Sequence, residues 1–205
     1  MRSSQGTVIL LVGPSCAGKS TLAEAIQSAS ARPFLIQSLD GLFAVTPEAY
    51  GGNGRHSREG FRYEGLVPWG GDAAPVRRIA YGTVGWRLLQ GFHRAVGAYA
   101  RAGVDVIVDD MLLDLEGLTD WATALADLEV VLVKVIADEE ELLRREAARV
   151  RRSTPGLVKG HLDLHLRIAA DLEIDTSSLS PSDAAIQILA IASRPGAARA
   201  LAAVR

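Results

Sequence analysis

The segment GPSCAGKST, residues 13–21, constrains the fold of this chain more than any other stretch. Its first eight residues fit the pattern G-x-x-x-x-G-K-[ST], with Gly13, Gly18, Lys19 and Ser20 at the four fixed positions. The apolar run TVILLV precedes the pattern and the run LAEAIQ follows it, so the glycines lie in a turn between a strand and a helix. In this context the pattern forms a phosphate-binding loop, the Walker A motif.

The chemistry of such a loop predicts that a nucleoside triphosphate binds here, taken as ATP with Mg²⁺. Glycines let backbone N–H groups turn toward the β-phosphate, and the positive end of the following helix attracts the anion. Lys19 reaches the β and γ oxygens, and the Ser20 hydroxyl ligates Mg²⁺. A plain glycine-rich turn is the alternative, and Cys16 is interpreted as a small residue that fits a tight loop. The predicted nucleotide contacts are Gly13, Ser15, Cys16, Ala17, Gly18, Lys19, Ser20 and Thr21.

Apolar runs along the chain are typical of a parallel sheet. Three are nearly continuous and rich in β-branched residues, at 7–12, 104–110 and 129–137, and two weaker ones lie at 33–39 and 172–177. Strands that are apolar on both sides belong to sheets whose two faces are both covered.

Helix-like segments alternate with these runs. They lie at 19–30, 76–102, 115–127, 138–152 and 180–193. The last segment opens with Ser180 and Pro181, a good N-cap followed by proline at the first helical position. The alternation predicts an α/β three-layer sandwich of the P-loop kinase type, with a mostly parallel five-stranded sheet, helices on both faces and a small lid.

Residues 47–75 interrupt this alternation. The segment is rich in glycine and in charged residues, and it shows no clear periodicity. A stretch of this length inside a compact domain is usually a functional or a mobile loop. We therefore expect a functional insertion whose aromatic side chains contact the small molecule that receives the phosphate, with Tyr63 and Trp69 as the candidate contacts. Ordinary packing of these aromatic side chains within the loop is the alternative.

Composition limits the classes of partner. With 205 residues, 48% hydrophobic and 22% charged, the chain suits one globular domain over residues 1–205. A formal net charge of −2 gives no cationic field for nucleic acid or for an anionic membrane surface. We find no signal peptide, no apolar run of the roughly 18 residues that span a membrane, and a single cysteine, which favours the cytoplasm. The oligomeric state stays open, a homo-oligomer included.

Three aspartates follow expected strands. Asp40 comes directly after PFLIQSL, and Asp109 and Asp110 end the run VDVIVDD. Ligands of open α/β sheets bind beyond the carboxyl ends of the strands, so these side chains should face the phosphate site. An apolar strand ending in aspartate beside a phosphate loop is the Walker B arrangement, which makes Asp109 the predicted Mg²⁺ ligand and Asp110 a further site candidate. Alternatively, one of the pair, or Asp40, caps the helix that follows.

The segment DEEELLRREAARVRR, residues 138–152, is rich in charge. Pairs at i and i+4 in the favourable order, such as Glu141 with Arg145, indicate a solvated helix. Toward the end, Arg149, Arg151 and Arg152 outnumber the acids. A basic helix end after the fourth strand is where small kinases carry a lid, expected here at about residues 145–160, whose arginines stabilise charge in transfer. A plain solvated face is the alternative.

The four histidines show no metal-ligand spacing with acids or thiols. His161 and His165 are four residues apart but lack an HExxH frame. Surface or core positions are therefore expected for them.

Several segments together resemble the chloramphenicol phosphotransferase family of P-loop kinases. They are GPSCAGKS, QSLDGLF, ARAGVDVIVDDMLLD, RREAARVRR and LEIDTS, in the family's order and close to its spacing. The resemblance implies that Asp40 acts as the base on the acceptor hydroxyl. It also implies that Arg149 and Arg152 belong to a lid that stabilises the transferring phosphoryl group. Lys19, assigned from the phosphate-binding motif, completes the predicted catalytic set. Residues 47–90 show little correspondence beyond length.

The predicted function is ATP-dependent transfer of the γ-phosphate to a hydroxyl of a small molecule. An antibiotic of the chloramphenicol type is the expected acceptor, inactivated by phosphorylation, although the departure at 47–90 allows another. Arg55, Arg58 and Arg62 keep open a metabolic kinase for a sugar acid, a shikimate-like compound or a nucleoside. An NTP-dependent switch or ATPase is less favoured, because no candidate water-positioning glutamine lies near the Asp109 strand and no N-K-x-D motif is present.

Overall fold

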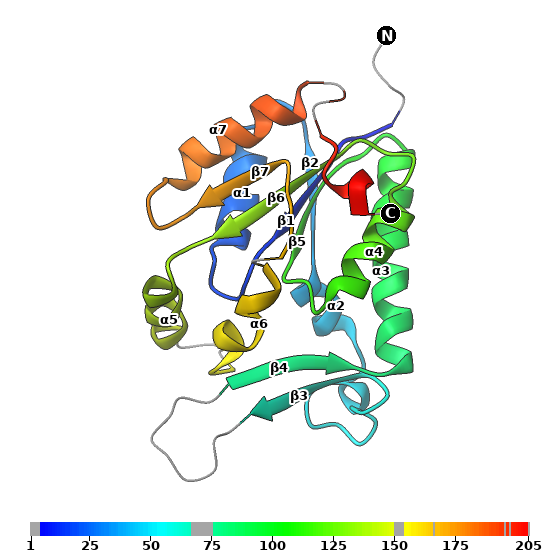
Figure 1. Ribbon diagram of the computed structural model, residues 1–205. Helices are drawn as coiled ribbons and strands as arrows, with labels where there is room; N and C mark the ends of the chain where they lie inside the picture. The colour runs from blue at the N-terminus through cyan, green and yellow to red at the C-terminus, as the bar shows by residue number, and fades with distance from the viewer. Residues whose placement is uncertain are drawn as a thin grey trace.

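The computed structural model describes residues 5–66, 76–149, 154–165, 167–194, 196 and 198–204. Within them, the central sheet has five parallel strands in the order β2–β5–β1–β6–β7 (Figure 1). The strands are β1 Val8–Val12, β2 Phe34–Ser38, β5 Asp105–Asp110, β6 Val130–Ile136 and β7 Leu172–Asp175. Each of the five apolar runs supplies one strand, so the parallel sheet expected from the sequence is confirmed.

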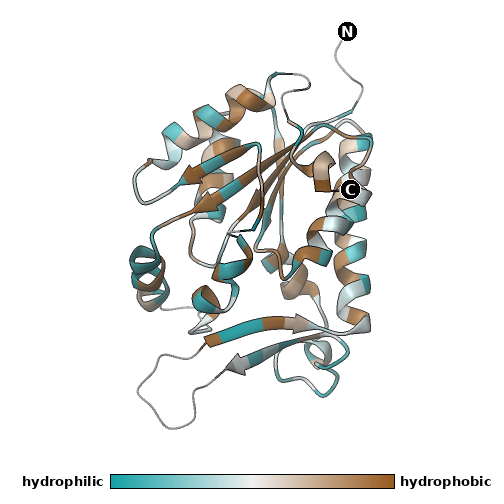
Figure 2. Cartoon of the chain, in the orientation of Figure 1, coloured by the Kyte–Doolittle hydropathy of each residue, from teal (hydrophilic) through white to brown (hydrophobic). Residues whose placement is uncertain are grey.

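Helices cover both faces of this sheet, and the apolar strands lie between them (Figures 1 and 2). Successive residues of β1 point to opposite faces, and all of them are fully buried. Leu10 packs with α3, α4 and η2 on one face, whereas Ile9 and Leu11 pack with α1 and α7 on the other. The helical bounds are α1 Lys19–Ala29, α3 Thr83–Arg101, α4 Leu115–Ala124, α7 Pro181–Ala192 and η2 Leu201–Val204.

The N-cap expected for the last long helix is present, since the Ser180 side chain accepts a hydrogen bond from Asp183 N at the start of α7. Among the described residues, no helix combines the length and the apolar character needed to cross a bilayer. With helices on both faces of the five-stranded parallel sheet, the architecture is the three-layer α/β sandwich that the sequence predicts.

A two-stranded hairpin lies beyond the carboxyl ends of the central strands (Figure 1). Its strands, β3 Phe61–Leu66 and β4 Val76–Tyr81, are antiparallel. The expectation of one helix over 76–102 is therefore wrong in its first part, because residues 76–81 pair with β3 and the helix begins only at Thr83. Pairing with a distant segment overrides the local pattern here, and periodicity alone does not reveal it.

Glycines allow the segment before β3 to pack back on itself. Residues Leu39–Val45 form α2 and Glu48–Tyr50 form the 3₁₀ helix η1. A Cβ added at Gly60 would lie 2.0 Å from the Tyr50 carbonyl oxygen, and one added at Gly82 would lie 2.1 Å from the Arg58 carbonyl oxygen. No side chain fits at such distances, so these glycines let the segment close against the start of α3.

The charged segment forms a shorter helix than expected. The helix α5 spans Glu139–Ala148, and Arg149 already has an extended backbone. A further helix that the sequence did not predict, α6, spans Leu157–His165. It packs tightly on the hairpin, because a Cβ at Gly160 would lie 1.7 Å from the Arg77 carbonyl oxygen and His161 Nε2 accepts a hydrogen bond from Ile79 N at 3.0 Å.

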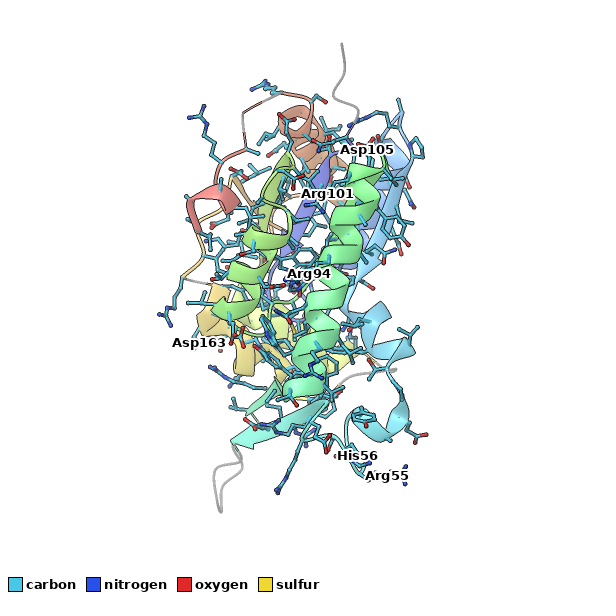
Figure 3. The ribbon with its side chains drawn as sticks, turned by 90° about the vertical axis from the view of Figure 1, so that its right-hand side faces the viewer. Arg55, His56, Arg94, Arg101, Asp105 and Asp163 are labelled. Carbon is cyan, nitrogen blue, oxygen red and sulfur yellow. The ribbon has the colours of Figure 1, made fainter. Side chains whose placement is uncertain are left out.

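Side chains of α3 hold the α4 layer in place (Figure 3). Arg94 donates two hydrogen bonds to Asp120, at 3.0 and 3.1 Å, and Arg101 pairs with Asp127. His93 Nδ1 lies 2.6 Å from Asp120 Oδ2, and burial lowers the pKa of His93. The contacts to Asp120 link α3 to α4, and the pair of Arg101 with Asp127 links the end of α3 to the turn that follows α4.

Candidate active site

The phosphate-binding loop leaves the middle of the sheet. Because β1 lies between β5 and β6, residues 13–18 emerge at the centre of its carboxyl edge, where ligands bind in such sheets. A Cβ at Gly13 would lie 2.2 Å from the Val135 carbonyl oxygen, and Gly18 has φ 91. A side chain at position 13 would collide with this carbonyl, and the left-handed backbone at position 18 favours glycine, which explains the two fixed glycines of the motif. Cys16 also has a left-handed backbone, with φ 65.

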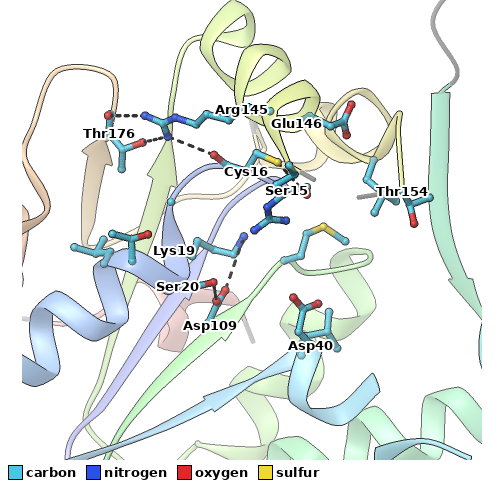
Figure 4. Close-up of a pocket in the computed structure, with 18 of the residues that line it drawn as sticks. Ser15, Cys16, Lys19, Ser20, Asp40, Asp109, Arg145, Glu146, Thr154 and Thr176 are labelled. Atoms are coloured by element: carbon cyan, nitrogen blue, oxygen red, sulfur yellow. Dashed lines mark hydrogen bonds and ion pairs between the residues drawn. The ribbon is translucent and has the colours of Figure 1, made fainter. Parts of the chain in front are cut away.

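Lys19, Ser20 and Asp109 meet at the start of α1 (Figure 4). Lys19 Nζ donates to the carbonyl oxygens of Gly13 and Pro14, each at 2.9 Å, and lies 3.9 Å from Asp109 Oδ1. Ser20 Oγ donates to Asp109 Oδ2 at 2.5 Å. The hydroxyl and carboxylate oxygens that the sequence assigns to Mg²⁺ therefore lie side by side, and oxygen donors of this kind fit a Mg²⁺ ion that also binds phosphate.

Asp40 faces the same cavity from the start of α2, just after the end of β2. The cavity has a volume of about 630 Å³, and Lys19, Ser20, Asp40 and Asp109 all line it. Asp40 is exposed in the first turn of α2. Ser38, and not Asp40, caps that helix, because Ser38 Oγ accepts a hydrogen bond from Gly41 N. The Asp40 carboxylate is thus left directed at the cavity (Figure 4).

Most of the expected nucleotide contacts line this cavity. They are Ser15, Cys16, Gly18, Lys19, Ser20 and Thr21. Gly13 and Ala17 do not line it: Gly13 offers its carbonyl oxygen to Lys19, and Ala17 is fully buried. The P-loop, Lys19, Asp40 and Asp109 thus lie together at the carboxyl edge of the sheet, where β1, β2 and β5 end.

The basic end of α5 borders the cavity as well. Arg149 is exposed and lines it, whereas Arg152 lies outside the described residues. Glu146 accepts hydrogen bonds from Gly156 N and Val158 N, both at 3.0 Å, and so links α5 to the start of α6. Within the segment expected to be a lid, about residues 145–160, Glu146 therefore connects the end of α5 to Gly156 and Val158.

Asp110 has a different environment from Asp109. It is 3% exposed, its Oδ1 accepts a hydrogen bond from Leu112 N at 2.8 Å, and its Oδ2 accepts one from Trp121 Nε1 at 2.7 Å. Successive residues of a strand point to opposite sides, so when Asp109 faces the P-loop, Asp110 faces α4. Asp110 does not line the main cavity, and its carboxylate fixes the turn after β5.

Side chains of the hairpin extend the cavity away from the P-loop. Tyr63 and Ile79 line the main cavity together with Phe43, and the same three residues line an adjoining cavity of about 270 Å³. Phe61 forms another part of the adjoining wall. Trp69, the other expected acceptor contact, lies outside the described residues.

Two residues beside the P-loop were not predicted as part of the site. Arg145, noted in the sequence only as a helix partner of Glu141, donates to Cys16 O and to Thr176 Oγ1. Thr176 follows β7, and both residues line the main cavity. The signal that identifies Asp40 and Asp109, a polar residue at the carboxyl end of a strand, also applies to Thr176.

The two histidines of α6 are core residues, as expected. His161 is 1% exposed and His165 is 2% exposed. Burial lowers the pKa of His161 to about 4, and burial together with the Lys19 charge lowers the pKa of His165 to about 3. Both rings are therefore neutral near neutral pH.

Comparison with known proteins agrees with this geometry. The profile of the family described as "Chloramphenicol phosphotransferase-like protein" matches residues 6–193. The chain belongs to this family. It is similar to a Mycobacterium tuberculosis protein named "Putative O-phosphotransferase", with 29% identity over 186 residues that cover 85% of this chain and 76% of the relative.

Solved structures of kinases share the fold. A sugar kinase from Janibacter sp. superposes with a TM-score of 0.63 at 16% identity, covering 94% of this chain and 98% of that one. The tunicamycin resistance protein of Deinococcus radiodurans superposes with a TM-score of 0.58 at 19% identity, covering 91% of this chain and 95% of that one. The chain is a phosphotransferase of the P-loop kinase type, as its sequence predicts.

Proposed function

We propose that this chloramphenicol phosphotransferase-like protein transfers the γ-phosphate of ATP, with Mg²⁺, to a hydroxyl group of an antibiotic of the chloramphenicol type. The observation that carries the proposal is the shared cavity. Asp40 faces the same space as Lys19, Ser20 and Asp109, so a carboxylate lies where an alcohol can approach a nucleotide held by the P-loop.

Each residue then has a distinct role. The P-loop amides and Lys19 bind the phosphates, and Ser20 with Asp109 hold Mg²⁺, which neutralises charge on the phosphate oxygens. Asp40 orients the acceptor hydroxyl and accepts its proton as the oxygen attacks the γ-phosphorus, the bond from that phosphorus to the β–γ bridging oxygen breaks and ADP leaves. Arg149 and, by its position in the sequence, Arg152 stabilise the charge of the transferring group.

The charge of the adjoining cavity, on the hairpin side, favours an uncharged acceptor over a sugar acid. Arg62 lines the adjoining cavity, but its Nε and Nη2 both donate to Glu64 Oε1 and its Nη1 donates to the Arg58 carbonyl oxygen. Arg55 and Arg58 are exposed and line neither cavity. Of the three arginines that suggested an anionic acceptor, only Arg62 lines either of these two cavities, and its guanidinium is already paired with Glu64 and the Arg58 carbonyl oxygen.

The apolar walls support the same choice. Phe43, Phe61, Tyr63 and Ile79 would contact the body of an apolar or aromatic alcohol whose hydroxyl reaches Asp40. The resistance protein among the structural neighbours is consistent with an antibiotic acceptor for this fold. Expression of the chain should then raise resistance to chloramphenicol.

A panel of acceptors tests the proposal. The purified protein is incubated with ATP, Mg²⁺ and, in turn, chloramphenicol, other hydroxyl-bearing antibiotics, gluconate, shikimate and nucleosides, and the products are examined by mass spectrometry for a phosphate adduct. We expect an adduct on a neutral antibiotic and little ATP turnover without an acceptor. The Lys19→Ala variant should form no adduct. An adduct confined to the anionic metabolites, or turnover that ignores every alcohol, would contradict the proposal.

A further inference from the structure

The guanidinium of Arg145 joins three distant segments of the chain (Figure 4). Its Nη1 donates to Thr176 Oγ1 at 2.9 Å and to the Cys16 carbonyl oxygen at 3.3 Å, and its Nη2 donates to the Thr176 carbonyl oxygen at 3.0 Å. Its Nε donates to Glu141 at 2.7 Å, which balances the positive charge. Through this one side chain, α5 is bound both to the end of β7 and to the P-loop.

Thr176 extends the contact to the next residue of the loop. Its hydroxyl lies 2.8 Å from the Ala17 carbonyl oxygen and 3.2 Å from the Ile136 carbonyl oxygen. A hydroxyl has one proton to donate, so the shorter contact to Ala17 is the main bond. The Thr176 backbone is itself fixed, because its N–H donates to the Ile136 carbonyl oxygen at 2.9 Å. The hydroxyl thus holds the loop from a rigid position on the sheet.

These contacts set the direction of the loop peptides. In a trans peptide the C=O and the following N–H point to opposite sides, and the described chain has no cis peptide. When the Cys16 and Ala17 carbonyls are held toward Arg145 and Thr176, the N–H groups that follow them must point the other way. The N–H of Ala17 donates to the Pro14 carbonyl oxygen at 3.3 Å, within the loop, and the N–H of Gly18 points away from Thr176. The left-handed Cys16 backbone, with φ 65, is unfavourable for a residue other than glycine and needs such support.

We propose that Arg145 and Thr176 are positioning residues for the nucleotide, which act through the carbonyls of Cys16 and Ala17. They hold the P-loop in its phosphate-binding form before the nucleotide arrives, and they do not contact the phosphates themselves. The inference rests on the proposed function only for its nucleotide, and it makes no use of the acceptor.

Two substitutions at one position test the inference. Thr176→Val keeps the shape of the side chain but removes the hydroxyl, whereas Thr176→Ser keeps the hydroxyl. Binding of a non-hydrolysable ATP analogue and of inorganic tripolyphosphate is measured by calorimetry with Mg²⁺ and without any acceptor. We expect Thr176→Val to weaken both ligands by about tenfold, as loss of one well-placed hydrogen bond implies. Thr176→Ser should bind both within about twofold of the wild type.

Binding of tripolyphosphate, which has no nucleoside, distinguishes this positioning role from a direct contact with the nucleobase of ATP. If Thr176→Val weakened the ATP analogue alone, the residue would contact the nucleoside and the inference would be wrong. Unchanged binding of both ligands, or no tripolyphosphate binding by the wild type, would also overturn it. Should Thr176→Val fail to fold, Arg145→Gln carries the same test with the same expected loss for both ligands. A protein with an unforeseen acceptor would still give the expected result, so the two proposals fail separately.

Discussion

Ser20 Oγ donates a hydrogen bond to Asp109 Oδ2 at 2.5 Å, which joins the first turn of α1 to the end of β5. The other oxygen of the same carboxylate lies 3.9 Å from Lys19 Nζ. One aspartate therefore faces both the hydroxyl and the ammonium group of the P-loop. A divalent cation bound beside a triphosphate would take its protein oxygens from this pair.

Asp109→Asn should increase the Mg²⁺ concentration that the enzyme needs. The amide keeps a hydrogen bond with Ser20 but removes a negative charge from the cation site, so we expect at least tenfold more Mg²⁺ at half-maximal rate and kcat lower by about 100-fold. The measurement is phosphoryl transfer at fixed ATP over a range of Mg²⁺ concentrations. An unchanged Mg²⁺ dependence would remove Asp109 from the cation site.

Asp110→Asn is the matched comparison at the adjacent position. Asp110 is buried and accepts hydrogen bonds from Leu112 N and Trp121 Nε1, so an amide that presents an N–H to one of these donors should lower the free energy of unfolding by about 1–3 kcal/mol. Urea unfolding measures this loss. The Mg²⁺ dependence should stay at the wild-type value, and a shift as large as that of Asp109→Asn would show that the two aspartates act together on the cation.

The sequence predicted the features that depend on neighbouring residues. The P-loop, the five strands and the Ser180 cap all follow from local patterns, and Asp109 and Asp40 follow because the carboxyl ends of parallel strands share one edge. Once β5 is known to include both aspartates, the alternation of side chains along a strand also predicts that Asp109 and Asp110 point to opposite faces of the sheet.

Features that depend on distant contacts were not predicted. The run Val76–Tyr81 becomes a strand because it pairs with Phe61–Leu66, and nothing local distinguishes it from the start of α3. The role of Arg145 depends on the P-loop, 129 residues away in the sequence. A helix pattern shows that Arg145 lies near Glu141, but it does not show which other segment the guanidinium meets.

Asp40→Asn should retain nucleotide binding and lose most of the transfer. An amide cannot accept the proton of the attacking hydroxyl, and a general base contributes about 10²–10⁴-fold to such a step. Because Asp40 makes none of the P-loop contacts, the affinity for an ATP analogue should change by less than about twofold. Rates on the acceptor found by mass spectrometry, together with calorimetric binding, check both parts. Near-native kcat would show that Asp40 is not the base.

Tyr63→Ala should weaken acceptor binding without affecting ATP. Tyr63 is 46% exposed and lines both cavities, so truncation removes apolar contact for the body of the acceptor. We expect the acceptor KM to rise about five- to tenfold, with the KM for ATP unchanged. Tyr63→Phe retains the ring and should remain close to wild type. Equal effects of the two substitutions would instead point to the hydroxyl group.

Acid should destabilise the protein through the buried histidines of α6. The pKa of His161 falls from 6.5 to about 4 because the ring is buried, and its Nε2 can accept the hydrogen bond from Ile79 N only when that nitrogen carries no proton. The unfolded chain therefore binds more protons between pH 6.5 and about 4. The stabilisation is complete above pH 6.5 and is lost as the pH falls through this window.

Substitution of His165, the second buried histidine of α6, measures how much a buried neutral histidine contributes to the loss of stability in acid. The ring of His165 is buried, with 2% of the residue exposed, and burial lowers its pKa to about 3. His165→Leu removes a group that must otherwise take up a proton on unfolding, so the loss of stability between pH 7 and pH 4 should shrink by up to about 3 kcal/mol. Urea unfolding of both proteins at the two pH values gives the difference directly. An identical loss in the variant would place the acid sensitivity elsewhere in the chain.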